Sequence, residues 1–171
     1  MAGAYSRGAP PSLPIPIHVV PHQGVLVSTT IWLRISATIS LLFAVGHSLG
    51  GMRNWSPNAD NPVLQSMRAV HFDVMGVNRS YLDFYRGFGY SISVSLVLQA
   101  VLLWMLSGVA RRDASIARPM IGAFAVAAAL GTLIAWRYIF PVPAVFSLVL
   151  CAVLIFAYVA ARRSPAVAAP G

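Results

Sequence analysis

Four apolar stretches of near-equal length divide the chain and predict four helices. They cover about residues 28–48, 83–107, 119–139 and 143–161. Each is close to the roughly 20 residues that a helix needs to cross about 30 Å of hydrocarbon. Pro141 and Pro143 force a tight break between the last two, which must form a helical hairpin. We therefore predict an all-α fold, a four-helix transmembrane bundle.

The chain outside these stretches is polar and rich in proline. Residues 1–24 hold five prolines with Ser, Gly and Ala between them, so we expect a disordered arm. This arm is too long and too lightly charged to begin a signal peptide, and the first apolar segment should remain in the mature protein. Residues 25–163 form the predicted membrane domain, and residues 164–171 a flexible tail.

A short interfacial helix is predicted in the loop after the first span. Asn61 is a natural N-cap, Pro62 fits the first turn, and Gly76 is a plausible stop, so the helix should cover about residues 62–75. Its apolar positions recur at helical spacing: Val63, Met67, Val70 and Val74. We expect this helix to roof the mouth of the bundle.

The second span opens on a capping signal and carries a regular polar stripe. Ser80 followed by Asp83 has the spacing of a capping box. Small and polar residues then stand at every fourth position: Asp83, Gly87, Ser91, Ser95 and Gln99. Positions four apart share a helix face, so this stripe is predicted to look into the bundle and to line a ligand site.

Composition places the chain among integral membrane proteins. Hydrophobic residues make up 58% of it, charged residues 9%, and the mean hydropathy is +0.74. All 12 basic residues are Arg and all 4 acidic residues are Asp. No basic patch with interleaved aromatics is apparent, so we expect no nucleic-acid partner. The net charge of +8 instead indicates membrane orientation and anionic lipid.

The arginines predict the orientation. With four spans, both termini and the loop at 108–118 lie on one side, and this side is the more basic. The positive-inside rule places it in the cytoplasm. Arg34 lies about one turn into the first span, and its side chain should snorkel back to that interface.

Three charged residues at the start of the second span form the clearest polar constellation. On a helix, Asp83 would be four residues from Arg79 and three from Arg86, so two guanidinium groups could clamp one carboxylate. This network could simply anchor the span, or leave an arginine free for an anionic ligand. Arg137, beside Trp136 at the outer end of the third span, could join either arrangement.

His47 lies near the outer end of the first span. It could carry a proton, ligate haem or a metal, or form a hydrogen bond within the bundle. His71 and Asp73 would point to different sides of the loop helix, and no metal-ligand spacing is present. We expect no metal site and no cofactor. Tyr81 and Tyr85 share a helix face, in an interfacial aromatic belt or in a pocket for a lipophilic ligand.

The segments HSLGG (47–51), HFDVMG (71–76) and RSYLDFYRGFG (79–89) resemble a group of small bacterial four-helix membrane proteins of unassigned function. In architecture alone the chain is more distantly similar to anthrone-oxygenase-like and DoxX-like membrane proteins. The resemblance implies a bacterial inner membrane location. It also raises the expectation of a cofactor-poor enzyme acting on a lipophilic substrate.

Two functional hypotheses follow. In the first, a membrane enzyme isomerises, cyclises or oxidises a hydrophobic small molecule in an outer pocket. His47 and Asp83 would transfer protons, Arg79 or Arg86 would act as a clamp, and Tyr81 or Tyr85 would orient the substrate. Ligand contacts would come from the remaining polar positions: His71, Asp73, Ser91, Ser95, Gln99, Trp136 and Arg137. In the second, a non-enzymatic accessory or lipid-binding protein uses the same residues to lock helices. A homodimer is open in both.

Overall fold

The computed structural model describes residues 23–51 and 60–163. Its elements in chain order are α1 (Gln23–Gly46), a π-helical turn η1 (His47–Gly51), α2 (Pro62–Ala69), β1 (His71–Val74), β2 (Val77–Ser80), α3 (Tyr81–Arg112), α4 (Ala114–Tyr138) and α5 (Pro141–Arg162). The predicted all-α class is confirmed, and four helices are long and apolar enough to cross a membrane. The chain is a multi-pass membrane protein. The expected arm and tail at 1–22 and 164–171 lie outside the described residues.

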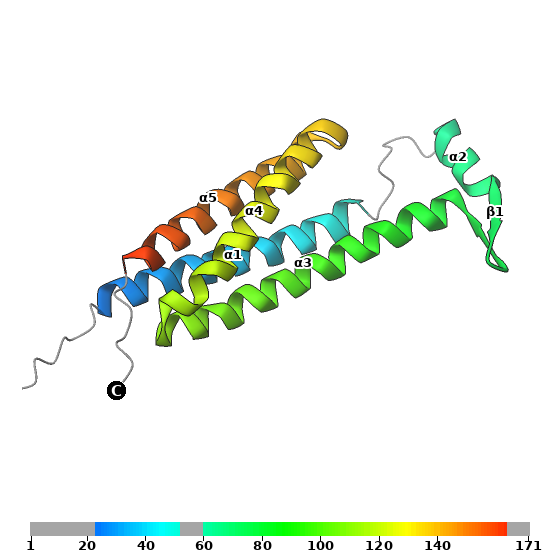
Figure 1. Cartoon of the computed structure of the whole chain (residues 1–171). Helices are drawn as coiled ribbons and strands as arrows, with labels where there is room; N and C mark the ends of the chain where they lie inside the picture. Colours follow the sequence, from blue (N-terminus) through cyan, green and yellow to red (C-terminus); the bar gives the residue numbers. More distant parts are fainter. Residues whose placement is uncertain (1–22, 52–59, 164–171) are drawn as a thin grey trace, which may run out of the picture.

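Helix α1 is the centre of the bundle (Figure 1). It packs against α3 on one side and against α5 on another, while α4 packs mainly against α5. Helices α3 and α4 meet near their connection and diverge toward the other end, where α2 and the strands sit at the tip of α3. We call the end at the α3–α4 connection the basic end, for Arg111, Arg112, Arg118, Arg162 and Arg163. The opposite end is the hairpin end.

The interior of the bundle is made of small and branched apolar side chains. Leu33 of α1, Leu103 of α3 and Leu154 of α5 are fully buried, and alanines fill the remaining contacts. Stacked rings join α1 to α5, with centroids 5.3 Å apart for Trp32 and Phe156. Most other large apolar side chains face outward. This pattern suits a protein whose surroundings are lipid tails rather than water.

Helix α4 begins five residues before the predicted start at Pro119. Asp113 caps it, because its carboxylate accepts hydrogen bonds from the backbone N–H of Ser115 at 2.8 Å and from the Ser115 hydroxyl at 2.6 Å. These hydrogen bonds hold the pKa of the Asp113 carboxyl below its usual value. Pro119 therefore lies in the second turn, and the cap one residue after α3 makes the α3–α4 connection short.

The loop helix is shorter than predicted, and a β-hairpin follows it. Asn61 caps α2 as expected, but the helix ends at Ala69. Strands β1 and β2 then pair antiparallel around Met75 and Gly76, which both have positive φ. Two such residues form the tight turn whose twist matches a two-stranded ribbon. Gly76 is thus a turn residue rather than the stop of a helix.

Candidate functional site

Polar side chains join α1 to α3 at three levels. Near the basic end, the Thr30 hydroxyl lies 3.5 Å from the carbonyl oxygen of Ser107. In the middle, Gln99 Nε2 donates to Ser40 Oγ at 3.0 Å. The third level is at His47, where α1 passes into the π turn. Hydrogen bonds between membrane helices fix their register, so this seam holds α1 against α3.

The third level is a compact cluster around Ser93 of α3. Its Oγ lies 3.0 Å from Nδ1 of the half-buried His47 and 2.9 Å from Oγ of Ser48. The Ser48 hydroxyl also lies 2.8 Å from the carbonyl oxygen of Ala44. Every hydroxyl proton in the cluster therefore has an acceptor within the protein. A π turn often marks a functional site, but here its polar groups satisfy one another.

The structure does not bring Asp83 to His47. The Asp83 carboxylate accepts hydrogen bonds from the backbone N–H of Ser80 at 3.2 Å and from its hydroxyl at 2.7 Å, completing the predicted capping box. His47 contacts Ser93, which lies ten residues further along α3, about 15 Å at 1.5 Å per residue. A proton relay that needs both groups on one substrate does not form here.

The predicted arginine clamp on Asp83 is also not formed. Arg79 belongs to β2 rather than to the helix, and its Nη1 donates to the carbonyl oxygen of Asn78 at 2.8 Å. Within the described part of the chain, no ion pair joins Asp83 to Arg79 or to Arg86. The chain turns sharply at Ser80, so Arg79 cannot lie one helical turn before the carboxylate. The network acts as a helix cap.

Only one end of the predicted polar stripe on α3 faces α1. Gln99 does so, whereas Ser91 and Ser95 are exposed and donate to carbonyl oxygens of their own helix. Four residues advance a helix by about 400°, so an every-fourth pattern rotates by about 40° per step. Over four steps it leaves the interface. Ser93, at the mixed spacing of three and four, holds the contact instead.

His71 and Asp73 lie on β1, where positions two apart share a face, so they point to the same side rather than to different sides. Both are exposed. The His71 ring nitrogen Nδ1 lies 3.0 Å from the carbonyl oxygen of Ala69, and Asn78 Nδ2 donates to Asp73 at 2.8 Å across the hairpin. These contacts stabilise the hairpin. No bond connects them to the cluster at Ser93.

The tyrosines lie on the outer surface of the first turns of α3. Tyr81 and Tyr85 are 50% and 44% exposed, and the Tyr81 ring packs on Phe72 of β1 with centroids 5.1 Å apart. Phe72 also meets Phe84, which meets Phe88. These rings form a continuous aromatic ridge that holds the hairpin on α3. They do not enclose a pocket in which a hydroxyl could orient a substrate.

Trp136 and Arg137 lie at the far end of α4, away from the hairpin (Figure 1). Trp136 is 78% exposed, and the Arg137 guanidinium sits 5.3 Å above the ring of its neighbour Tyr138. Because α4 packs mainly on α5, neither residue reaches the start of α3. They fit the belt of aromatic and basic residues expected at a membrane surface.

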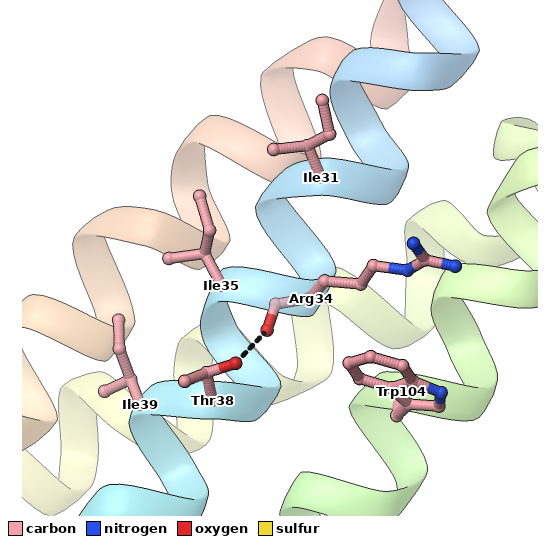
Figure 2. Close-up of a pocket in the computed structure, with 6 residues that line it drawn as sticks. All are labelled: Ile31, Arg34, Ile35, Thr38, Ile39 and Trp104. Carbon is pink, nitrogen blue, oxygen red and sulfur yellow. Dashed lines mark hydrogen bonds between the residues drawn. The ribbon is translucent and has the colours of Figure 1, made fainter.

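A groove of about 330 Å³ runs along α1 on the side nearer the basic end. Its lining is mostly apolar and comes from two helices: Ile31, Arg34, Ile35, Thr38, Ile39 and Trp104. In Figure 2, Arg34 extends from α1 over the ring of Trp104 on α3, and the isoleucines follow one another along α1. The guanidinium carbon is 5.1 Å from the ring centroid. This volume lies in the range of ligand pockets.

The groove carries one polar group that is not already occupied. The Thr38 hydroxyl donates to the carbonyl oxygen of Arg34 at 3.0 Å, so it adds little polarity to the wall. No hydrogen bond or ion pair joins the Arg34 guanidinium to another residue of 23–51 or 60–163. Sequence reasoning considered Arg34 only as a snorkelling residue. The isoleucine spacing was readable, but its partner Trp104 is 70 positions away.

Comparison with known proteins adds no assignment. Neither a family model, nor a curated protein, nor a solved structure matches the chain. Among the described residues, no group of three or more His, Cys, Asp or Glu side chains is placed to hold a metal ion. The site must therefore be judged on its own geometry, which separates a hydrogen-bonded helix contact at Ser93 from a groove at Arg34.

The capping box predicts a local effect of changing Ser80. In Ser80→Ala the first turn of α3 loses the side-chain acceptor for the Asp83 N–H, a loss that typically costs about 1 kcal/mol. Amide exchange over residues 81–84 should accelerate about fivefold, while exchange in the rest of α3 is unchanged. Ser91→Ala is the control, since its hydroxyl serves only its own helix. Equal exchange in both variants would contradict a capping role.

Proposed function

We propose that the protein is a non-enzymatic membrane protein that binds a membrane lipid along α1. The observation that carries the proposal is the groove, with three isoleucines, a tryptophan face and an arginine in one wall. An elongated apolar lining with one cation suits an amphiphile. Helices held together by a polar seam would keep such a groove open without a bound ligand.

The polar cluster at the hairpin end supports the non-enzymatic hypothesis. His47, Ser48 and Ser93 bond one another, and Asp83 bonds Ser80. An acid/base site needs these groups within reach of one substrate. We propose that they lock α1 and the hairpin to α3 instead. The location we propose is the bacterial inner membrane, with the basic end and both termini in the cytoplasm, as the positive-inside rule favours.

Filling the groove tests the proposal. Ile35 is 38% exposed and lines the groove, so the indole in Ile35→Trp should occupy part of the lipid volume. Native mass spectrometry of protein released from phospholipid nanodiscs should show about one retained lipid per chain in the wild type. Occupancy should fall about tenfold in the variant, which corresponds to about 1.4 kcal/mol.

Leu42→Trp is the matched control, because Leu42 lies on the same helix, is 57% exposed and does not line the groove. It should retain lipid as the wild type does. Equal loss in both variants would reflect general damage to the surface. A wild type that releases every lipid would refute the proposal.

One contact favours the enzyme hypothesis as a second candidate. An imidazole nitrogen 3.0 Å from a serine hydroxyl is the geometry of a base beside a nucleophile or proton donor. If the pair is catalytic, His47→Gln should fold normally and change the lipophilic molecules that co-purify with the protein, as seen by mass spectrometry. An unchanged set of bound molecules would exclude this candidate.

A further inference from the structure

Resting on the proposed lipid-binding function, we infer that the ligand is an anionic phospholipid whose phosphate is held by Arg34. The guanidinium forms the polar part of the groove, and its apolar part continues along α1 past Ile35 to Ile39. These two regions match the two parts of a phospholipid. The assignment names the headgroup chemistry, which the groove volume alone does not.

The depth of Arg34 in the bundle is the first argument. The guanidinium lies over Trp104, and Trp104 is seven residues before Arg111 on α3, about 10 Å along the axis. Arg34 therefore lies well inside the level of the arginines at the basic end. A cation at such depth is costly unless it is paired or hydrated.

The partners of Arg34 are the second argument. A guanidinium offers five N–H donors, and the face of an aromatic ring accepts none of them as a conventional hydrogen bond. Trp104 is the only aromatic ring that meets this guanidinium among the described residues, and no carboxylate there is paired with it. A phosphate diester carries one negative charge and two exposed oxygens, which a planar guanidinium can bind in bidentate geometry.

Charge at the basic end is the third argument. Five arginines gather there, whereas Asp113 is the one acidic residue, and its carboxylate is engaged by Ser115. Each arginine near a membrane surface attracts anionic lipid. The lipid would enter at this end. From Ile31 to Ile39 the groove covers eight residues, about 12 Å, close to the roughly 15 Å of one leaflet.

Competition between two lipids tests the inference. Wild-type protein in detergent would be titrated with phosphatidylglycerol and phosphatidylcholine of identical acyl chains, and the bound lipid measured by native mass spectrometry. We expect the wild type to prefer phosphatidylglycerol at least about fivefold, the effect of one arginine near a charged lipid. R34Q should bind both lipids equally. Retention of the preference in R34Q would overturn the inference.

R162Q is the matched control, because Arg162 also lies over an aromatic ring, with its guanidinium carbon 5.5 Å from the centroid of Tyr158, but does not line the groove. It should keep the preference, and its loss there as in R34Q would overturn the inference by indicating diffuse attraction. If R34Q does not accumulate, R34M keeps the apolar stem and must show the same loss.

The two proposals fail in different ways. Equal binding of both lipids by the wild type, abolished by Ile35→Trp, overturns the phosphate assignment and leaves lipid binding in place. Binding of neither lipid overturns both. Retention of a detergent or a fatty acid in place of either phospholipid also overturns the phosphate assignment.

Discussion

Replacing Leu33 by alanine is expected to lower the free energy of unfolding by about 2 kcal/mol, the low end of the range for buried leucines. Leu33 is fully buried in α1, in the cluster that α1 shares with α3 and α5. Lipid tails are as apolar as a leucine side chain, so the transfer contribution is small in a membrane. The lost packing around the resulting cavity remains, and it sets the size of the effect.

Leu41→Ala is the control for this experiment, because Leu41 lies on the same helix and is 49% exposed. Unfolding by a denaturing detergent, followed by circular dichroism, should shift markedly for Leu33→Ala and little for Leu41→Ala. Equal shifts would mean that α1 is not the central helix of the bundle, and the described packing would then be incorrect.

Removing the Ser93 hydroxyl is the second change with a large expected effect. Ser93→Ala deprives both His47 and Ser48 of their partner on α3. Single hydrogen bonds between membrane helices average about 0.6 kcal/mol and reach about 1.7 kcal/mol. Because two contacts are lost, we expect about 1.5 kcal/mol, measured by the same unfolding assay. Ser95→Ala, whose hydroxyl donates to the carbonyl oxygen of Ser91, should change little.

A double-mutant cycle separates a helix lock from a catalytic pair. His47→Ala and Ser93→Ala should each destabilise the protein, and together by less than the sum, with a coupling of about 0.5 kcal/mol or more. A lock requires this coupling. Additive effects on stability, with His47→Ala as stable as the wild type, would contradict the lock and favour the enzyme.

The features that sequence reasoning predicted correctly depend on partners close in the chain. The Ser80–Asp83 capping box and the Asn61 cap each involve residues no more than three positions apart. The spans follow from long apolar runs, which tolerate an error of several residues at each end. Such features need no knowledge of which helix lies beside which.

The features that were missed depend on rotation or on distant partners. An every-fourth pattern placed Ser91 and Ser95 in the bundle because its drift around the helix was not counted. The hairpin was missed because a methionine with positive φ is uncommon, and Met75 gives no turn signal. Arg34 and Trp104 meet only because α1 and α3 pack side by side.

Helix α3 has 32 residues, which at 1.5 Å each make a rod of about 48 Å, whereas a bilayer core is about 30 Å thick. The excess must be taken up by tilting or by extension into water. Since the hairpin and the aromatic ridge are fixed to the tip of this rod, their height above the lipid headgroups depends on membrane thickness. A thicker bilayer would draw the phenylalanines into the acyl chains, and a thinner one would leave them in the aqueous phase.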